Sequence, residues 1–275
     1  MNGTRARRTL RPGLAVWPAV LILLVLFILG WLLFRYLRRE RGGTVGGPSP
    51  PGETTTARRR GLFDMPVKPT PVQMTFEGCP PEGDNVRMGE LNRLKNRVDD
   101  AASPRLVPFD SVFALPWPPA ATRGTSAGWP AGVRAAIERY QGIPVAIEGY
   151  LANARESGPE SPNCHGADNP YQDWHVWLSA TPGTNRTRSI VVEATPRVRA
   201  RHPGWTLAKL RRTARDSTRV RVTGWLMFDP EHPEQLGRTR GTIWEIHPIT
   251  RIEVSRAGRW ALLDSVSAST RSSRR

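Results

Sequence analysis

Apolar side chains alternate with polar or small ones along much of the second half of this chain. In residues 143–151, Ile143, Val145 and Ile147 recur at every second position. A period of two places successive side chains on opposite faces of a β-strand. The same pattern recurs in four further segments, at residues 173–180, 189–195, 219–229 and 241–254. The sequence therefore predicts five strands, with a break at Pro248 in the last.

The order of these segments favours one kind of barrel. Residues 202–215 carry apolar positions at helical spacing and stand between the third and fourth strands. Gly149 and Gly224 lie inside the first and fourth strands, where glycine permits strong bending. Three strands, a helix and two strands are the order of the OB-fold, a five-stranded Greek-key barrel. We predict a mainly β domain with flanking helices, an OB-like barrel over residues 143–255, with a small sandwich as the alternative.

The segment before the barrel has helical rather than alternating patterning. Apolar positions follow helical spacing within residues 86–98 and again within 129–140, where Gly142 ends the second helix. We predict that residues 76–142 form a helical N-terminal extension wrapped on the barrel.

A long apolar run lies near the N-terminus. Residues 14–34 contain no charge over 21 residues, and a helix of that length spans roughly 31 Å, the thickness of the hydrocarbon layer of a bilayer. A secretory signal peptide is the alternative, but Arg35, Arg38 and Arg39 stand where a cleavage site needs small residues. The sequence predicts one transmembrane helix that contacts membrane lipid.

The remaining segments have the composition of tails and a tether. Residues 1–13 form a basic tail, residues 35–75 a Gly/Pro/Arg-rich linker, and residues 256–275 a basic Ser/Arg-rich tail. Arginines flank the apolar run about equally on both sides, so they do not fix its orientation. A short N-terminal tail before a single span favours a cytoplasmic N-terminus. We therefore expect a membrane protein with an extracytoplasmic C-terminal domain.

The net charge of +16 suggests an anionic partner, but the charge is unevenly distributed. Residues 1–60 hold 11 Arg and 2 acidic residues, which gives +9 and leaves +7 for residues 61–275. More than half of the excess therefore lies beside the predicted membrane helix, where arginines meet anionic headgroups. The predicted barrel domain is only mildly basic.

Several phrases of the sequence resemble a known family. They are GPESPNCH, TPRVRARHPGW, GWLMFDPEHP and WEIHPIT, within about residues 79–255. Together they resemble a family of uncharacterised bacterial proteins with an OB-like domain. The resemblance implies a bacterial source and an OB-like barrel, and it brings no settled activity. That family often has a second cysteine in the loop where this chain has Pro162, a departure that weakens a metal site built on two thiolates.

Residues 161–178 gather a cysteine, two histidines and two aspartates. One hypothesis is a metal site formed by Cys164, His175 and His247, although paired ligands at zinc-site spacing are absent from the sequence. The alternative is a polar turn followed by a strand on which His175 points outward. A third hypothesis is a disulfide between Cys79 and Cys164, which an extracytoplasmic domain would allow.

The outer face of the second and third strands is the usual ligand face of an OB barrel. That face, the neighbouring arginines and the fifth strand supply the candidate ligand-binding residues His175, Trp177, Glu193, Arg197, Arg199, Glu245 and His247. The arginines could follow the phosphates of a nucleic acid, or they could solvate a turn and the start of a helix.

The sequence favours a binding protein over an enzyme. It contains no P-loop, nucleophile elbow or HExxH motif, and no cofactor or catalytic residue is indicated. We predict a single-pass membrane-anchored protein with an OB-like binding or assembly module whose ligand or protein partner is unknown. The alternatives are a membrane-tethered nucleic-acid-binding protein and a metal-dependent hydrolase.

Overall fold

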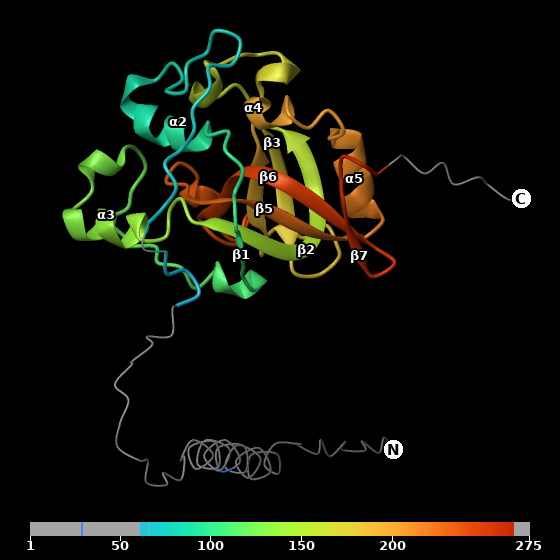
Figure 1. The fold of residues 1–275 in the computed structure, drawn as a ribbon. Coiled ribbons are helices and arrows are strands. Elements are labelled where there is room, and N and C mark those ends of the chain that lie inside the picture. The colour runs from blue at the N-terminus through green and yellow to red at the C-terminus, as the bar shows by residue number, and fades with distance from the viewer. Residues whose placement is uncertain (1–28, 30–60, 66, 267–275) are drawn as a thin grey trace, which may run out of the picture. The chain divides into compact units, whose positions relative to one another are not determined.

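A computed structural model describes residues 29, 61–65 and 67–266 of the protein (Figure 1). The chain divides into two units, residues 1–58 and 59–275, and the fold described below belongs to the second. Among the described residues, no helix combines the length and apolar character needed to cross a bilayer. The transmembrane helix predicted at residues 14–34 lies outside the described residues, apart from Leu29, as does the basic tail at 1–13.

Five strands close into a barrel, as the alternating pattern predicts. They are β2 (Pro144–Glu156), β3 (Trp174–Ser179), β4 (Ile190–Ala194), β5 (Arg219–Phe228) and β6 (Trp244–Arg256). The sheet runs in the order β2, β3, β4, β6, β5, and β5 pairs with β2 to complete the circle. All neighbours are antiparallel except β4 and β6, which are parallel. This order is compatible with an OB-like barrel.

The barrel core follows the period of two. In β3, Trp174, Val176 and Leu178 belong to the main hydrophobic core, and the intervening side chains lie on the outer face. Gly224 lies where β5 crosses β6 with a shifted register. A Cβ atom at that position would collide with the carbonyl oxygen of Pro248 and with Ile246. The glycine is therefore required by the close approach of the two strands.

The helix between the third and fourth barrel strands is shorter than the sequence predicts. Helix α5 (Leu207–Arg215) begins after Thr206, whose side chain accepts a hydrogen bond from the backbone amide of Lys209. A separate short helix, α4 (Pro196–Arg199), precedes it. Residues 202–206 are not helical, because Pro203 and Gly204 favour a turn.

The N-terminal extension is less helical than predicted. It contains only two short α-helices, α2 (Gly89–Lys95) and α3 (Ala131–Glu138), within the described residues. A short strand, β1 (Arg105–Leu106), pairs in parallel with β2.

Single 3-10 turns occur in the extension and in the loops of the barrel. They are η1 (Val86–Met88), η2 (Phe109–Ser111), η3 (Ser126–Gly128), η4 (Ser161–Asn163), η5 (Asn169–Tyr171) and η6 (Pro233–Gln235).

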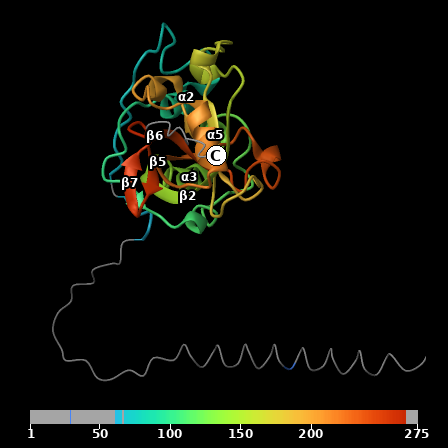
Figure 2. The same ribbon diagram turned by 90° about the vertical axis from the view of Figure 1, so that its right-hand side faces the viewer.

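The elements around the barrel occupy different sides of it. Figure 1 shows α2 and α3 on one side and α5 on the other, and Figure 2, turned by a quarter, shows α5 in front of them. Strand β7 (Arg259–Leu262) pairs with β6 along its outer end. The sequence assigned these residues to a tail, but Trp260 and Leu262 occupy positions of a paired strand.

Candidate functional site

Six titratable side chains meet on the outer face of β3, β4 and β6. We call them the acid–histidine cluster, and its members are Glu160, Asp173, His175, Glu193, Glu245 and His247. Five of the six are buried, with His175 7% exposed, Glu193 3% and Asp173 0%, and Glu160 is partly exposed. The cluster is therefore a set of charged groups largely held out of water.

Strand register explains how these residues meet. His175 and Glu193 are directly paired across β3 and β4. Val192 pairs with Ile246 between β4 and β6, and both belong to the barrel core. Their neighbours in sequence therefore point away from the core, which places Glu245 and His247 beside Glu193. The period of two thus brings side chains from three strands together on one face.

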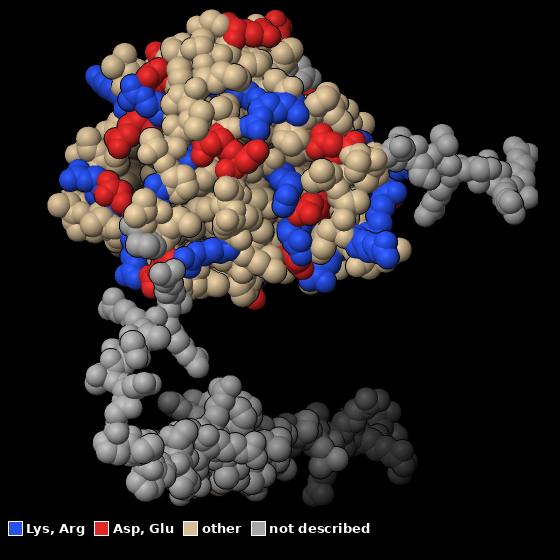
Figure 3. Space-filling view, viewed as in Figure 1, with Lys and Arg blue, Asp and Glu red and all other residues tan. Residues whose placement is uncertain are grey.

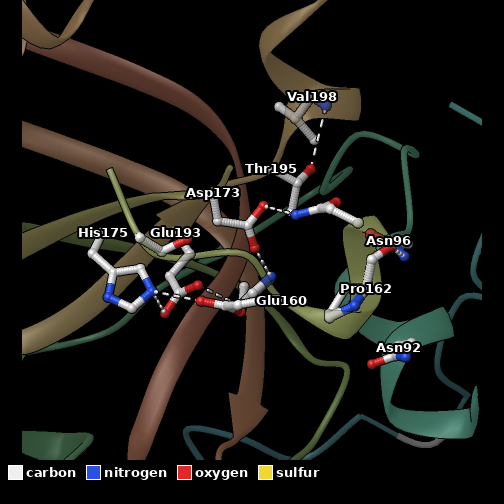
Figure 4. Close-up of polar contacts among 12 residues, drawn as sticks. Asn92, Asn96, Glu160, Pro162, Asp173, His175, Glu193, Thr195 and Val198 are labelled. Atoms are coloured by element: carbon white, nitrogen blue, oxygen red, sulfur yellow. Dashed lines mark hydrogen bonds and ion pairs between the residues drawn. The ribbon is translucent and has the colours of Figure 1, made fainter. Parts of the chain in front are cut away.

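Two histidines are each held between carboxylates. The Nε2 atom of His175 lies 3.1 Å from Oε1 of Glu193 and 3.6 Å from Oε1 of Glu160. Figure 4 shows this imidazole pointing between the two carboxylates. The Nδ1 atom of His247 lies 3.2 Å from Oε2 of Glu193 and 3.2 Å from Oε1 of Glu245. Its Nε2 atom lies 3.6 Å from Oδ2 of Asp173.

These contacts shift the pKa values in opposite directions. Burial alone would lower the pKa of His247, but the charge of Glu193 and the hydrogen bonds to Glu193 and Glu245 together outweigh burial and raise it to about 10. The pKa of His175 rises well above its usual value for the same reasons. Burial raises the pKa of Asp173 to about 6. Burial would also raise the pKa of Glu193, but the two histidines hold it well below its usual range. The carboxylates of the cluster therefore favour the protonated, positively charged form of both histidines.

A second group of charges supports the cluster from β5 and the following turn. The Nη1 atom of Arg240 lies 2.7 Å from Oδ2 of Asp229, and its Nη2 atom lies 3.3 Å from Oε2 of Glu245. His232 binds the same Asp229 oxygen through Nδ1 at 2.8 Å. Arg240 is completely buried. It therefore links the acid–histidine cluster to the Asp229–His232 pair.

A pocket leads from the surface to these charges. Its volume is about 320 Å³, and its walls come from α2, the turn at η4 and the segment after β5. Lys95, Glu160 and His232 line it, and each also interacts electrostatically with the buried charges. Lys95 is buried; burial alone would lower its pKa, but Glu160 and other carboxylates raise it. A volume of this size suits a small molecule.

The outer strand face is not the open surface that the sequence suggested. Trp177 is 1% exposed and packs with Ala152 and Val191 in a second small core. The guanidinium carbons of Arg186 and Arg155 lie 4.7 Å and 5.4 Å from the centre of its ring. His175 points outward from the barrel core, as the sequence predicts, but it is buried because Glu160 and Glu193 enclose it.

The two arginines proposed to follow phosphates have other roles. Arg197 is buried, and it donates hydrogen bonds to the carbonyl oxygens of Met74, Cys79 and Pro80 and to the side chains of Asn96 and Asn163. Arg197 thereby joins the N-terminal extension to the barrel, and its donors are already used.

Arg199 is likewise engaged within the protein. Its guanidinium lies 4.3 Å from the ring centre of Trp174 and donates to the carbonyl oxygens of Pro170 and Gln172. Figure 3 shows acidic and basic side chains interspersed on the face in view, without a continuous basic stripe. The geometry of this region is therefore that of a packed structural interface.

The two cysteines are bonded to each other. Cys79 and Cys164 form a disulfide, with their Cα atoms 5.8 Å apart. A metal-binding cysteine needs its thiolate, so Cys164 does not join His175 and His247 as a ligand. A different group of buried side chains has spacing that could hold an ion, since ligand atoms of Asp173, Glu193 and His247 all lie within 4.8 Å of one another.

Sequence reasoning identified part of this site. His175, Glu193, Glu245 and His247 were candidates, and the structure brings all four together. Lys95 and Arg240 were missed, because neither belongs to a recognisable motif and both are distant in sequence from β3. For the strand residues of the site, the sequence did offer a signal: ionisable residues two apart in a predicted strand, such as Asp173 and His175, lie on the same face.

The described chain is thus a closed β-barrel with a buried charged cluster on its outer face. No protein-family model matches the chain. No curated protein matches it either. The barrel and the cluster are therefore the basis for assigning a function.

Proposed function

We propose that this protein is a membrane-tethered binding module with an OB-like barrel, whose ligand site is the acid–histidine cluster and its pocket. The OB-like assignment is supported by the strand order, by the parallel pairing of β4 with β6, and by α5 between the third and fourth barrel strands. The ligand site is placed on the outer face of the second and third barrel strands, the face that OB barrels commonly use.

The observation that carries the proposal is the burial of so many ionisable groups beside a pocket. Burying a carboxylate costs several kcal/mol in free energy unless partners compensate, so a hydrophobic replacement would often be as stable. Perturbed pKa values gathered at a cavity are characteristic of functional sites. Glu160 connects the two features, because it lines the pocket and contacts His175.

The pocket favours a small ligand that carries a phosphate or similar oxyanion. Lys95, Arg123 and His232 contribute basic groups to its walls. Helix α2, which ends at Lys95, and the η4 turn form its sides, so the outer strand face is not free to accept a long strand of nucleic acid. This enclosure distinguishes the site from the open groove of a nucleic-acid-binding OB barrel.

A thermal-shift experiment on the full chain in detergent tests this ligand class. We expect inorganic pyrophosphate to raise the melting temperature in a concentration-dependent way, because a ligand that binds only the folded state stabilises it. Lys95→Met should weaken the shift at least about tenfold in apparent affinity. Lys209→Met, on α5 and outside the pocket, is the matched control and should respond like the wild type. An equal response of both variants would exclude the pocket as the site.

The membrane anchor and an extracytoplasmic location belong to the same proposal. Support comes from the uncharged run at residues 14–34 and from the Cys79–Cys164 disulfide, since disulfides persist in oxidising compartments. A reporter enzyme that is active only outside the cytoplasm, fused after Arg275, should be active in bacterial cells. Activity of a cytoplasm-specific reporter at the same position would contradict this orientation.

A further inference from the structure

Each of three buried side chains in the acid–histidine cluster has one polar atom fixed and another left without a hydrogen bond. In Asp173, Oδ1 accepts from the side-chain amide of Asn163 at 2.9 Å. In Glu193, Oε1 lies 3.1 Å from Nε2 of His175. In His247, Nδ1 lies 3.2 Å from Oε1 of Glu245. The remaining atoms are Asp173 Oδ2, Glu193 Oε2 and His247 Nε2, and none has a hydrogen-bond partner among the described residues.

Buried polar atoms without a partner are rare and call for a physical explanation. These three side chains are at most 3% exposed, so bulk water does not reach them. Their contacts with one another are long or poorly aligned, namely 3.6 Å between His247 Nε2 and Asp173 Oδ2 and 3.2 Å between His247 Nδ1 and Glu193 Oε2. An ion bound by the three side chains would give these groups a partner.

The spacing of the three residues suits a metal ion. Ligand atoms from Asp173, Glu193 and His247 lie within 4.8 Å of one another. Two ligands bound at about 2.1 Å to one ion are separated by at most about 4.2 Å. Side-chain rotations that bring the ligand atoms about 1 Å closer would therefore complete the coordination. The fixed opposite atoms of the same groups resemble the supporting hydrogen bonds that orient metal ligands.

The charge of the surroundings also favours a cation. The buried carboxylates of this region are Glu160, Asp173, Glu193, Asp229 and Glu245. Two permanent cations, Lys95 and Arg240, oppose them. The carboxylates therefore outnumber the permanent cations, and the two histidines lie among them.

We propose that Asp173, Glu193 and His247 bind one divalent cation, each through one ligand atom. Two carboxylates and one imidazole suit Mn²⁺ or Zn²⁺, which accept mixed oxygen and nitrogen ligands, better than a soft ion that prefers thiolates. This metal site lies within the proposed ligand site, and it deepens the proposed function by placing a metal next to a phosphate-bearing ligand. It does not depend on which ligand the pocket takes.

Mn²⁺ titration of the full chain in detergent tests the proposal. After removal of metals with EDTA, electron paramagnetic resonance should detect one bound Mn²⁺ per chain. The pulsed spectrum should show coupling to one imidazole nitrogen, that of His247. This measurement uses the wild-type chain and does not depend on whether any variant folds. Absence of stoichiometric binding for both Mn²⁺ and Zn²⁺, or bound Mn²⁺ without nitrogen coupling, would overturn the proposal.

Variants locate the ion within the cluster. Asp173→Asn and Glu193→Gln keep the side-chain shape and should each weaken Mn²⁺ binding at least about tenfold. Asp168→Asn, an exposed acid in the loop before β3, is the matched control and should bind normally. Circular dichroism of each metal-free variant confirms that it is folded. Equal affinity in the folded variants and the control would place the ion elsewhere and refute the assignment.

A paired titration separates this inference from the proposed function. Pyrophosphate is added to metal-free and to Mn²⁺-loaded protein, and binding of each component is measured. Mn²⁺ binding without any pyrophosphate response supports the metal site and contradicts the oxyanion ligand. Pyrophosphate binding to a chain that binds no divalent ion supports the ligand proposal and contradicts the metal site.

Discussion

The charges around Asp229 illustrate how single residues are tuned by their neighbours. His232 hydrogen-bonds to Asp229, and this bond is the main cause of the raised pKa of His232. Burial and the cations Arg240 and Lys95 act in the opposite direction and lower that pKa. Burial would raise the pKa of Asp229, but His232, Arg240 and Lys95 hold it below its usual range. Each partner therefore favours the ionised form of the other.

His232→Gln should destabilise the protein more at pH 5.5 than at pH 9. A folded-state pKa above the unfolded value means that protonated His232 contributes stability below about pH 6.5, and this contribution is lost as the pH rises through the folded-state pKa. We expect the destabilisation to differ by about 1 kcal/mol between the two pH values, the scale of a charge-assisted hydrogen bond. Urea unfolding of both proteins at each pH measures it. An equal destabilisation at both pH values would contradict the role assigned to the histidine charge.

At the scale of elements, the barrel depends on a close crossing of β5 and β6. The register between these strands shifts on both sides of Gly224. The backbone of β6 approaches so closely that only glycine fits. Gly149 in β2 is similar, because a Cβ there would collide with the carbonyl oxygen of Ser179. The irregularity predicted at Gly224 is therefore present, whereas the pairing of β2 with β5 is regular at Gly149 and the glycine there is required by the close approach.

Gly224→Ala should destabilise the domain by about 2–4 kcal/mol, since the added methyl group overpacks the crossing and displaces backbone. Gly132→Ala is a matched control, because this glycine lies in helix α3 and a Cβ there meets no atom within 4 Å. Alanine should stabilise that helix by up to about 1 kcal/mol. Chemical unfolding compares the two. If Gly224→Ala left the free energy of unfolding unchanged, the two strands could separate at little cost in free energy.

At the scale of the whole described domain, the N-terminal extension is joined to the barrel by covalent and polar contacts. Cys79 in the extension is bonded to Cys164 in the loop before β3. Arg197, in helix α4, donates hydrogen bonds to the backbone oxygens of Cys79 and Pro162, one on each side of this bond. The extension is therefore held over the acid–histidine cluster and forms part of its enclosure.

Replacing both Cys79 and Cys164 by serine should lower the free energy of unfolding by about 2–5 kcal/mol, because the disulfide restricts a long loop in the unfolded chain. Treatment of the wild type with reductant should give a similar loss, and reductant should leave the double variant unchanged. Coincident unfolding curves for the wild type and the double variant would show that Arg197 and the packing of the extension suffice.

The sequence by itself determined the strands and their order along the chain, because the alternation of apolar and polar positions is a local property of the backbone. It also marked His175 and Glu193 as outward from the barrel. The alternation of apolar and polar positions does not indicate which segments cover the outward face of a strand. Only the tertiary structure decided that the extension encloses this face, since Lys95 and Arg240 reach it from distant segments.

The tertiary structure also decided between the disulfide hypothesis and the metal hypothesis for Cys164. Both used Cys164, and spacing along the chain could not choose between them. Three-dimensional proximity paired Cys164 with Cys79 and placed Asp173 beside Glu193 and His247. Burial then converted ordinary polar positions of three strands into a shared charged site, because the free energy of a charge depends on its surroundings and not on its place in the sequence.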